Sequence, residues 1–271
     1  MAVPEARIRP FKVEEKRLVN FLIAKGDMEA LATANRRGKC GLYFHPLSLA
    51  LWIGLSCVFI QLTGMWPKPE QGFLGYASPV PGLAAIAVPL MFLCDWINRP
   101  IFEEQADDDL RRPDLIDVPS YYSRSPSSGF WILEFSDKVV GFIAVDASLD
   151  STSDKTIASS PAPIKRKDGR VKYSEGTSKM ATIRHFYVDE PYRTVDIQSD
   201  LLSHAVQQVF ASSPVVERIR ASETPLKSYI GNALRKCGFE FELNTEKVGV
   251  LRWQNTIQVL KRQTWKKRSA T

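Results

Sequence analysis

Residues 129–145 read Gly129-Phe-Trp-Ile-Leu-Glu-Phe-Ser-Asp-Lys-Val-Val-Gly-Phe-Ile-Ala-Val145, two apolar runs on either side of the polar turn Ser136-Asp-Lys138. Both runs are rich in β-branched and aromatic residues, which is typical of strands. Because a turn of this length joins antiparallel neighbours, the stretch predicts a β-hairpin within a sheet.

Further strands and helices are expected on both sides of this hairpin. Residues 181–188 have the composition of a strand, and residues 197–210 repeat apolar side chains at the spacing of a buried helix face. The other expected elements are a strand over 7–12, helices over 13–25, 28–35 and 225–237, and strands over 215–221, 239–243 and 248–253. This order predicts an α/β fold built on one mixed sheet.

Two long blocks without charged side chains, residues 40–67 and 71–94, interrupt this pattern near the N-terminus. About 20 apolar residues are enough for a helix to cross a bilayer core. We therefore expect a membrane hairpin over 40–97 with two spans, about 43–66 and 73–96. Prolines within the blocks also fit a hairpin that enters only one leaflet, and a third interpretation is a pair of buried helices in a soluble core.

The charges that flank the hairpin predict its orientation. Basic residues precede the first block at positions 36, 37 and 39 and follow the second at Arg99, whereas the connecting loop carries only Lys68. Since positive charge is retained on the cytoplasmic side, both ends of the hairpin are expected in the cytosol.

The polar remainder is expected to form one split domain from residues 1–39 and 98–271. Its segment 149–179 is rich in Ser, Thr, Pro, Lys and Asp and has no apolar period, which predicts a disordered insertion between strands.

The overall charge limits the class of ligand. Lys and Arg number 36 against 30 Asp and Glu, a net charge of +6, which is a milder excess than nucleic-acid binding requires. We expect no nucleic-acid partner. The four cysteines have neither disulfide-framework nor metal-ligand spacing, so no metal site is expected.

Several short strings, in this order along the chain, resemble the GNAT superfamily of acetyl-CoA-dependent N-acetyltransferases. They are Ile8-Arg-Pro-Phe11, the stretch 129–145, His185-Phe-Tyr-Val-Asp-Glu-Pro-Tyr-Arg193 and Arg235-Lys-Cys-Gly-Phe239. More specifically, the chain resembles the membrane-anchored branch, the mammalian kidney and liver cysteine-conjugate N-acetyltransferases. The resemblance implies a mostly antiparallel sheet flanked by helices, with the transmembrane hairpin inserted near the N-terminus.

The resemblance also implies where acetyl-CoA is bound. One strand would separate from its neighbour and pair with the pantetheine arm, and the loop after it would hold the pyrophosphate against backbone N–H groups. In the family this loop reads Arg-x-x-Gly-x-Gly or Ala; here Asp196 and Gln198 replace the two small residues. The implied cofactor-binding residues are Phe186, Tyr187, Val188, Arg193, Thr194, Val195, Asp196, Ile197 and Gln198.

Three positions decide whether catalysis is retained. His185, on the strand beside the thioester, is the expected general base. Leu234 occupies the place where many members carry a Tyr that protonates the leaving thiolate. A carboxylate at Asp196 would repel the pyrophosphate, although an Asp here is also an ordinary helix N-cap.

Two functions follow from the resemblance. The first is transfer of acetyl from acetyl-CoA to an amine of a small amphipathic or membrane-presented substrate, by a protein of the endoplasmic reticulum membrane whose soluble domain faces the cytosol. The alternative is a catalytically degenerate scaffold, similar to the fungal accessory proteins that help phosphate transporters leave the endoplasmic reticulum. The expected partners are therefore the lipid bilayer and either a small-molecule amine or a membrane protein client.

Overall fold

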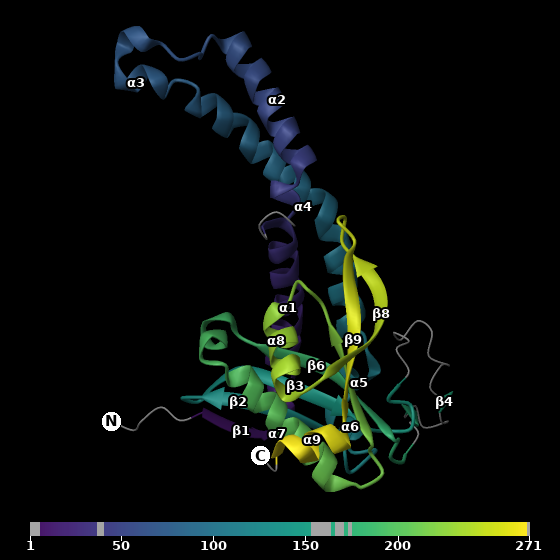
Figure 1. Cartoon of the computed structure of the whole chain (residues 1–271). Helices are drawn as coiled ribbons and strands as arrows, with labels where there is room; N and C mark the ends of the chain where they lie inside the picture. Colours follow the sequence, from purple (N-terminus) through teal and green to yellow (C-terminus); the bar gives the residue numbers. More distant parts are fainter. Residues whose placement is uncertain (1–5, 37–40, 153–163, 166–170, 173–174, 270–271) are drawn as a thin grey trace. The chain divides into compact units, whose positions relative to one another are not determined.

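The structure, a computed structural model, describes residues 6–36, 41–152, 164–165, 171–172 and 175–269 (Figure 1). The chain divides into two compact units. The first is made of Met1–Asp27, Gln105–Lys247 and Trp253–Thr271, and the second of Met28–Glu104 and Val248–Arg252.

The first unit is built on a seven-stranded sheet with the order β1-β2-β3-β6-β7-β9-β8. The pairs β1–β2, β2–β3, β3–β6 and β7–β9 are antiparallel, whereas β6–β7 is parallel. The strands are β1 (Ala6–Pro10), β2 (Gly129–Phe135), β3 (Lys138–Asp146), β6 (Met180–Val188), β7 (Arg218–Glu223), β8 (Glu240–Val248) and β9 (Trp253–Lys261). The expected mixed, mostly antiparallel sheet flanked by helices is confirmed.

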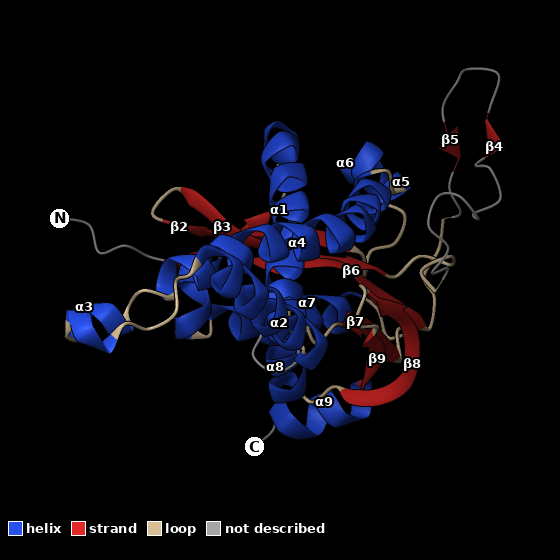
Figure 2. Ribbon diagram, turned by 90° about the horizontal axis from the view of Figure 1, so that it is seen from above, coloured by secondary structure: helices blue, strands red, loops and turns tan. Residues whose placement is uncertain are grey.

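Helices cover both faces of this sheet (Figure 2). Successive side chains of a strand point to opposite faces, so Phe142 and Ala144 join one core while Ile143 and Val145 join the other. The first core is closed by α1 (Lys16–Arg36), α5 (Pro113–Ile116) and α6 (Val118–Tyr122), and the second by α7 (Ile197–Ser212) and α8 (Ser228–Cys237).

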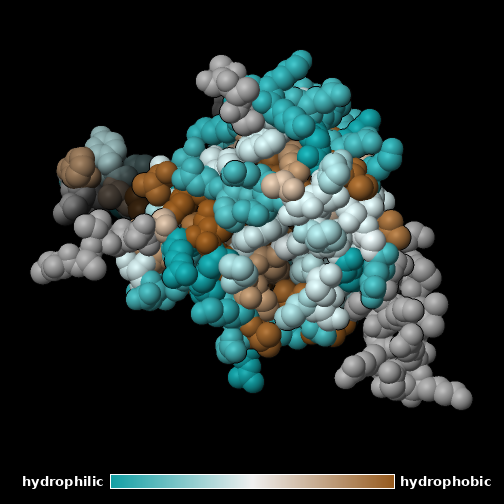
Figure 3. Space-filling view, turned by 90° about the horizontal axis from the view of Figure 1, so that it is seen from below, coloured by the Kyte–Doolittle hydropathy of each residue, from teal (hydrophilic) through white to brown (hydrophobic). Residues whose placement is uncertain are grey.

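The face of the first unit that is seen from below is mostly polar (Figure 3). Seen from below, hydrophilic and neutral residues dominate, and hydrophobic residues form small separate patches (Figure 3). The remaining short elements here are η1 (Val13–Glu15), η5 (Glu190–Val195) and α9 (Arg262–Ser269).

The end of the sheet differs from the sequence prediction. Instead of a strand over 248–253, the chain turns between β8 and β9, and β9 begins only at Trp253. Gly249 and Arg252 have φ values of 73° and 55°, in the left-handed region that interrupts an extended strand.

The second unit contains the apolar helix α2 (Pro46–Thr63) and the apolar part of α4 (Val80–Leu110), whose end from Gln105 onward belongs to the first unit. They pack closely, because a Cβ added at Gly82 would lie 2.8 Å from a side-chain carbon of Ile60. Both are long and apolar enough to cross a membrane, and only 11% and 6% of their most apolar windows are buried. This exposure contradicts the interpretation as buried helices of a soluble core.

The helix boundaries differ from the expected spans. Residues 73–96 are not one helix: α3 (Phe73–Tyr76) is separate, and α4 begins at Val80 and continues past position 96 to Leu110. Pro89 and Pro100 lie inside α4. The short elements η3 (Leu42–Phe44) and η4 (Pro69–Gln71) flank α2.

The ends of the predicted insertion 149–179 belong to the fold, which corrects its boundaries. Ser151 is buried and donates a hydrogen bond to the Met180 carbonyl, and Thr177 bonds to the Ser125 hydroxyl. Within the segment, β4 (Ile164–Lys165) and β5 (Val171–Lys172) pair with each other. Residues 153–163, 166–170 and 173–174 lie outside the described residues, so the expected disorder stays a prediction for them.

Candidate functional site

The parallel strands β6 and β7 separate partway along their length. Their pairing runs from Met180 opposite Arg218 to Ile183 opposite Ala221. Beyond this point β6 remains paired with β3 as far as Val188, while β7 follows β9 to its end. The half of β6 from 184 to 188 therefore has no β7 partner, and the sheet opens at this place.

A pocket of about 170 Å³ lies at this opening, within the first unit. Residues 183–187 of β6 and Ala221, Ser222 and Thr224 at the end of β7 form part of its wall. The other lining residues come from α1, the end of α4 and the turn after it, β3, α8 and β9: Ile23, Gly26, Asp27, Gln105, Asp109, Arg112, Phe142, Lys227, Ile230 and Asn255.

His185, the predicted general base, lines this pocket and is buried. Its Nε2 lies 2.8 Å from Oδ2 of Asp114, a buried carboxylate on α5. The Tyr122 hydroxyl donates a second hydrogen bond of 2.8 Å to the same oxygen. Burial opposes ionisation of Asp114, but the charge and hydrogen bond of His185, with the bond from Tyr122, hold the pKa of this carboxyl well below its usual range.

This arrangement orients an imidazole as a base. When Nε2–H donates to the Asp114 carboxylate, Nδ1 of a neutral ring is the acceptor, so Asp114 selects the tautomer. The pair can therefore accept a proton from a group bound in the pocket. Asp114 was missed in the sequence because it lies 71 residues from His185, in an acidic region without a motif.

Two further ion pairs line the pocket. Lys227 Nζ lies 2.7 Å from Asp27 Oδ1, and Arg112 lies 2.6 Å from Asp109 Oδ1. Burial raises the pKa of the Asp109 carboxyl, and nearby Asp27 raises it further. Burial opposes the charge of Lys227, but the carboxylate of Asp27 raises the pKa of that ammonium group. None of these four residues was selected from the sequence.

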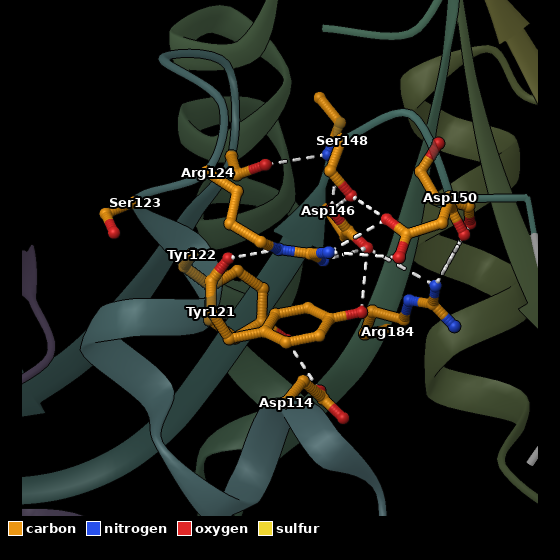
Figure 4. A network of polar contacts seen from close by, with 12 residues as sticks. Asp114, Tyr121, Tyr122, Ser123, Arg124, Asp146, Ser148, Asp150 and Arg184 are labelled. Atoms are coloured by element: carbon orange, nitrogen blue, oxygen red, sulfur yellow. Dashed lines mark hydrogen bonds and ion pairs between the residues drawn. The ribbon is translucent and has the colours of Figure 1, made fainter. Parts of the chain in front are cut away.

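A network of buried charges holds Arg184, the neighbour of His185 on β6 (Figure 4). Asp146 is fully buried, and its Oδ2 lies 3.3 Å from Nη2 of both Arg124 and Arg184. Arg124 also pairs with Asp150 at 2.9 Å, and the Tyr121 hydroxyl donates to Asp146 at 3.0 Å. Removing one partner of a buried ion pair costs about 3–5 kcal/mol. The network therefore resists displacement of Arg184 and of the part of β6 that carries it.

The three predicted residues of the cofactor strand lie beside the opening. Phe186 and Tyr187 line the pocket, and Val188 is buried. The carbonyl of Val188 accepts a 2.7 Å hydrogen bond from Nε of Arg193, whose guanidinium lies 4.0 Å from the centre of the Tyr229 ring. Arg193 is therefore turned back toward the end of β6.

The predicted phosphate loop carries Asp196 in a left-handed conformation, with φ 61° and ψ 21°. Glycine adopts this conformation without strain, so the backbone is of the kind that the family's glycine would allow. Asp196 occupies the N-cap position of α7, but its side chain does not cap a backbone N–H. It instead accepts bonds of 2.7 Å from Lys236 Nζ and 2.9 Å from the Ser199 hydroxyl.

This finding corrects two expectations about Asp196. The ordinary N-cap interpretation is wrong, because the carboxylate is used by side chains. The bond from Lys236 lowers the pKa of Asp196, so the carboxylate stays charged, but the lysine offsets the repulsion that the sequence alone predicted.

The other loop residues divide into exposed and inward-facing side chains. Thr194 and Val195 are exposed, while Ile197 and Gln198 are buried. The Gln198 amide donates to the Arg193 carbonyl at 3.2 Å and to Asp196 at 3.0 Å, and so closes the loop from inside. Leu234, where many family members have a Tyr, is fully buried in the core and offers no proton. A role of the loop in cofactor binding stays a prediction.

Comparisons with known proteins return structures only. No protein-family model matches the sequence, and no curated protein matches it. Among solved structures, the chain is similar to an acetyltransferase of the GNAT family from Streptococcus pneumoniae, with 12% identity, a TM-score of 0.45 and coverage of 95% of this chain and 99% of that one. An aminoglycoside acetyltransferase in complex with coenzyme A is similar at 12% identity and a TM-score of 0.44, covering 98% and 100%. A GNAT-family acetyltransferase from Staphylococcus aureus is similar at 11% identity and a TM-score of 0.41, covering 95% and 100%.

Proposed function

We propose that this chain is an acetyl-CoA-dependent N-acetyltransferase. The observation that carries the proposal is the His185–Asp114 pair in a pocket at the point where β6 and β7 separate. A base oriented by a buried carboxylate, next to strand backbone without a sheet neighbour, is what this chemistry requires.

The residues present fit acetyl-CoA in part. The edge of β6 beyond Ile183 offers backbone groups that an extended pantetheine arm could pair with. The left-handed backbone at Asp196 and the start of α7 are suited to a phosphate, and Lys236 brings a cation to the same place. Bound acetyl-CoA would supply the acetyl thioester.

The chain's own residues would perform three tasks in this reaction. The pocket binds the acceptor amine and excludes water from it. His185 accepts the proton that the amine loses when it is acylated, and Asp114 holds the imidazole in the tautomer with a free acceptor nitrogen. With Leu234 in place of Tyr, protonation of the thiolate is left to solvent, since the thiol of coenzyme A ionises near the usual thiol range.

The membrane part of the proposal rests on α2 and α4. We propose that they anchor the protein in the endoplasmic reticulum membrane as the cysteine-conjugate branch is anchored, with the catalytic unit in the cytosol. The exposed apolar surface of both helices supports an anchor, and such an anchor favours acceptors that are amphipathic or presented at the membrane.

Calorimetric titration of the detergent-solubilised full chain with acetyl-CoA tests this function. We expect micromolar binding, and release of coenzyme A when dodecylamine, an amphipathic primary amine, is added. His185→Gln should lower turnover roughly a hundredfold to ten-thousandfold without weakening acetyl-CoA, since a general base acts on the transition state. The matched control is His204→Gln, because His204 lies on α7 against Trp131 and does not line the pocket.

One observation favours the second candidate, a scaffold for a membrane protein client that has lost catalysis. In the predicted phosphate loop, the Gln198 amide donates to the backbone carbonyl of Arg193, and the Arg193 side chain donates to the Val188 carbonyl at the end of β6. If the folded wild-type chain binds no acetyl-CoA in the titration, the scaffold is the better description.

A further inference from the structure

Asp27 carries a buried carboxylate oxygen whose hydrogen-bonding capacity is not used. The residue is 2% exposed, and its Oδ1 accepts the bond from Lys227. Its Oδ2 is buried without a hydrogen-bond partner, although Asp27 lines the pocket. An ionised carboxylate can only accept, and leaving such a group unpaired costs about 1–3 kcal/mol or more.

A second unused acceptor lines the same pocket. Oδ1 of Asn255, on β9, is also buried without a partner. Asp27 and Asn255 belong to elements that are far apart in the sequence, α1 and β9, and both meet the pocket. A ligand that offers more than one N–H group would satisfy both oxygens.

The charge around the pocket indicates that this ligand is a cation. Some charged side chains line the pocket, and others form an ion pair with one that does. Besides His185, this set has four carboxylates and three basic groups: Asp27, Asp109, Asp114 and Asp146 against Arg112, Arg184 and Lys227. When His185 is neutral, as a base must be, this set carries a net charge of −1: Asp27, Asp109 and Asp146 each have a basic partner, and the missing counter-charge is the one opposite Asp114. A protonated nitrogen in the pocket would supply it, and its N–H groups would reach an acceptor in a charge-assisted bond.

We propose that the acceptor is a diamine, with one protonated nitrogen bound at Asp27 and a second, neutral nitrogen presented to His185. The inference rests on the proposed acetyl transfer only for the fate of the second nitrogen. A compound with a single amine would leave either the carboxylate or the base without its partner. An amino alcohol would supply the same positive charge at Asp27, but its second group is a hydroxyl, so no second amine would reach His185.

Titration calorimetry of the full chain in detergent, without acetyl-CoA, tests the subsite directly. The probes are diaminobutane, aminobutanol and butylamine, which share one chain length. We expect diaminobutane to bind about tenfold more tightly than either of the others. Asp27→Asn should weaken diaminobutane binding about tenfold or more, because it keeps an acceptor for Lys227 but removes the charge that holds the ammonium group. Asp108→Asn is the matched control, since Asp108 is an exposed neighbour of Asp109 on α4 and does not line the pocket.

A second variant covers the case in which Asp27→Asn does not fold, as judged by circular dichroism. Asn255→Ser shortens the other acceptor and should weaken diaminobutane binding about threefold or more. The proposal is overturned if the wild-type chain binds the three probes equally, or if a folded Asp27→Asn variant binds diaminobutane as tightly as the wild type. Acetyl-CoA titration of the same samples separates the two proposals: diamine preference without acetyl-CoA binding supports the subsite and contradicts the transferase.

Discussion

His185 and Asp114 are 71 residues apart in the sequence and 2.8 Å apart in the fold. Both side chains are nearly inaccessible to solvent, so the pair interacts in surroundings of low polarity, where charge and hydrogen bonding are strong. Asp114 does not line the pocket, which makes it a positioning residue for His185. Asp196 and Lys236 form a second ion pair between residues that are distant in the sequence.

Asp114→Asn should lower kcat about a hundredfold or more while acetyl-CoA affinity stays unchanged. The amide offers His185 a different hydrogen-bonding partner, so the ring is no longer held in one tautomer. Steady-state kinetics and calorimetry measure the two quantities. Asp107→Asn, an exposed change on α4, is the control. A drop in affinity equal to the drop in kcat would contradict a positioning role.

The lowered pKa of Asp114 predicts that the stability of the chain depends on pH. The pKa of Asp114 is lower in the folded than in the unfolded chain, so its contribution is fully present above the unfolded pKa of about 4 and is lost as pH falls through the folded pKa. The wild-type chain should therefore exceed Asp114→Asn in unfolding free energy at neutral pH, by an amount that shrinks as the pH drops below about 4. Urea unfolding at a series of pH values measures this difference; a constant difference would be inconsistent with an ionised Asp114.

Asp196→Gly should tighten acetyl-CoA about tenfold and change the melting temperature little. A non-glycine residue in the left-handed region costs about 1–2 kcal/mol, which glycine relieves, whereas an exposed ion pair contributes about 0–1 kcal/mol. The loss of the carboxylate also leaves Lys236 available to a phosphate. Calorimetry checks the affinity, with Asp200→Asn in the first turn of α7 as the control. Unchanged affinity would mean that phosphate is not bound at this loop.

At the scale of elements, the opening between β6 and β7 depends on which neighbour each strand keeps. β6 stays with β3 and β7 stays with β9, and the two pairs diverge after a common start at Met180 and Arg218. Backbone groups at such a place need other partners, and this need makes a fork in a sheet a natural binding site. The ends of the segment 149–179 are also held by hydrogen bonds to other parts of the first unit.

Replacing residues 153–174 with a short Gly-Ser linker should leave the melting temperature within about 2 °C, because the hydrogen bonds that join the described residues of this segment to the rest of the first unit come from 149–152 and 175–179. Asp150→Ala should destabilise the chain by about 1–2 kcal/mol, since buried Arg124 loses one of its two carboxylate partners. Differential scanning calorimetry compares both with Glu175→Ala, an exposed change at the other end. Equal melting temperatures for Asp150→Ala and Glu175→Ala would contradict the anchoring role of Asp150.

At the scale of the whole molecule, the chain combines a unit built on a seven-stranded sheet with a unit whose two apolar helices are largely exposed. Burial of that surface in a bilayer, at about 25 cal/mol per Å² of apolar area, would exceed the free energy that a typical domain gains on folding. The membrane hairpin is therefore the part of the proposal with the largest physical driving force.

Engineered glycosylation acceptors test its topology. Acceptors at either terminus should remain unmodified, because the basic residues that flank the hairpin favour a cytosolic location. An acceptor in the connection 64–72 should be glycosylated if the helices span the bilayer, and not if they enter one leaflet. Acceptor Asn→Gln versions are the controls. Glycan at the C-terminus would overturn the orientation.

The sequence by itself determined the features that depend on neighbouring residues. The strands around 129–145, the helix that begins at Ile197 and the two apolar helices follow from periods of two and 3.6 residues and from uncharged length, which are local properties. Local pattern also placed His185 on a strand, whereas its role as a general base was implied by the family resemblance and stays a prediction. Local pattern misplaced the turn at 249–252 because the two left-handed residues there include an Arg, which has no such signature.

Only the tertiary structure decided what surrounds the site. Asp27 meets Lys227 across 200 residues and Asp196 meets Lys236 across 40, so no spacing in the sequence relates them. Close approach at Gly26, where a Cβ would lie 3.0 Å from the Tyr187 ring, brings α1 against β6 and places Asp27 in the pocket. The sequence shows that a residue has a carboxylate, but the partner of that carboxylate depends on packing between distant elements. The partner in turn decides whether the carboxylate repels a ligand, positions another side chain or binds a ligand.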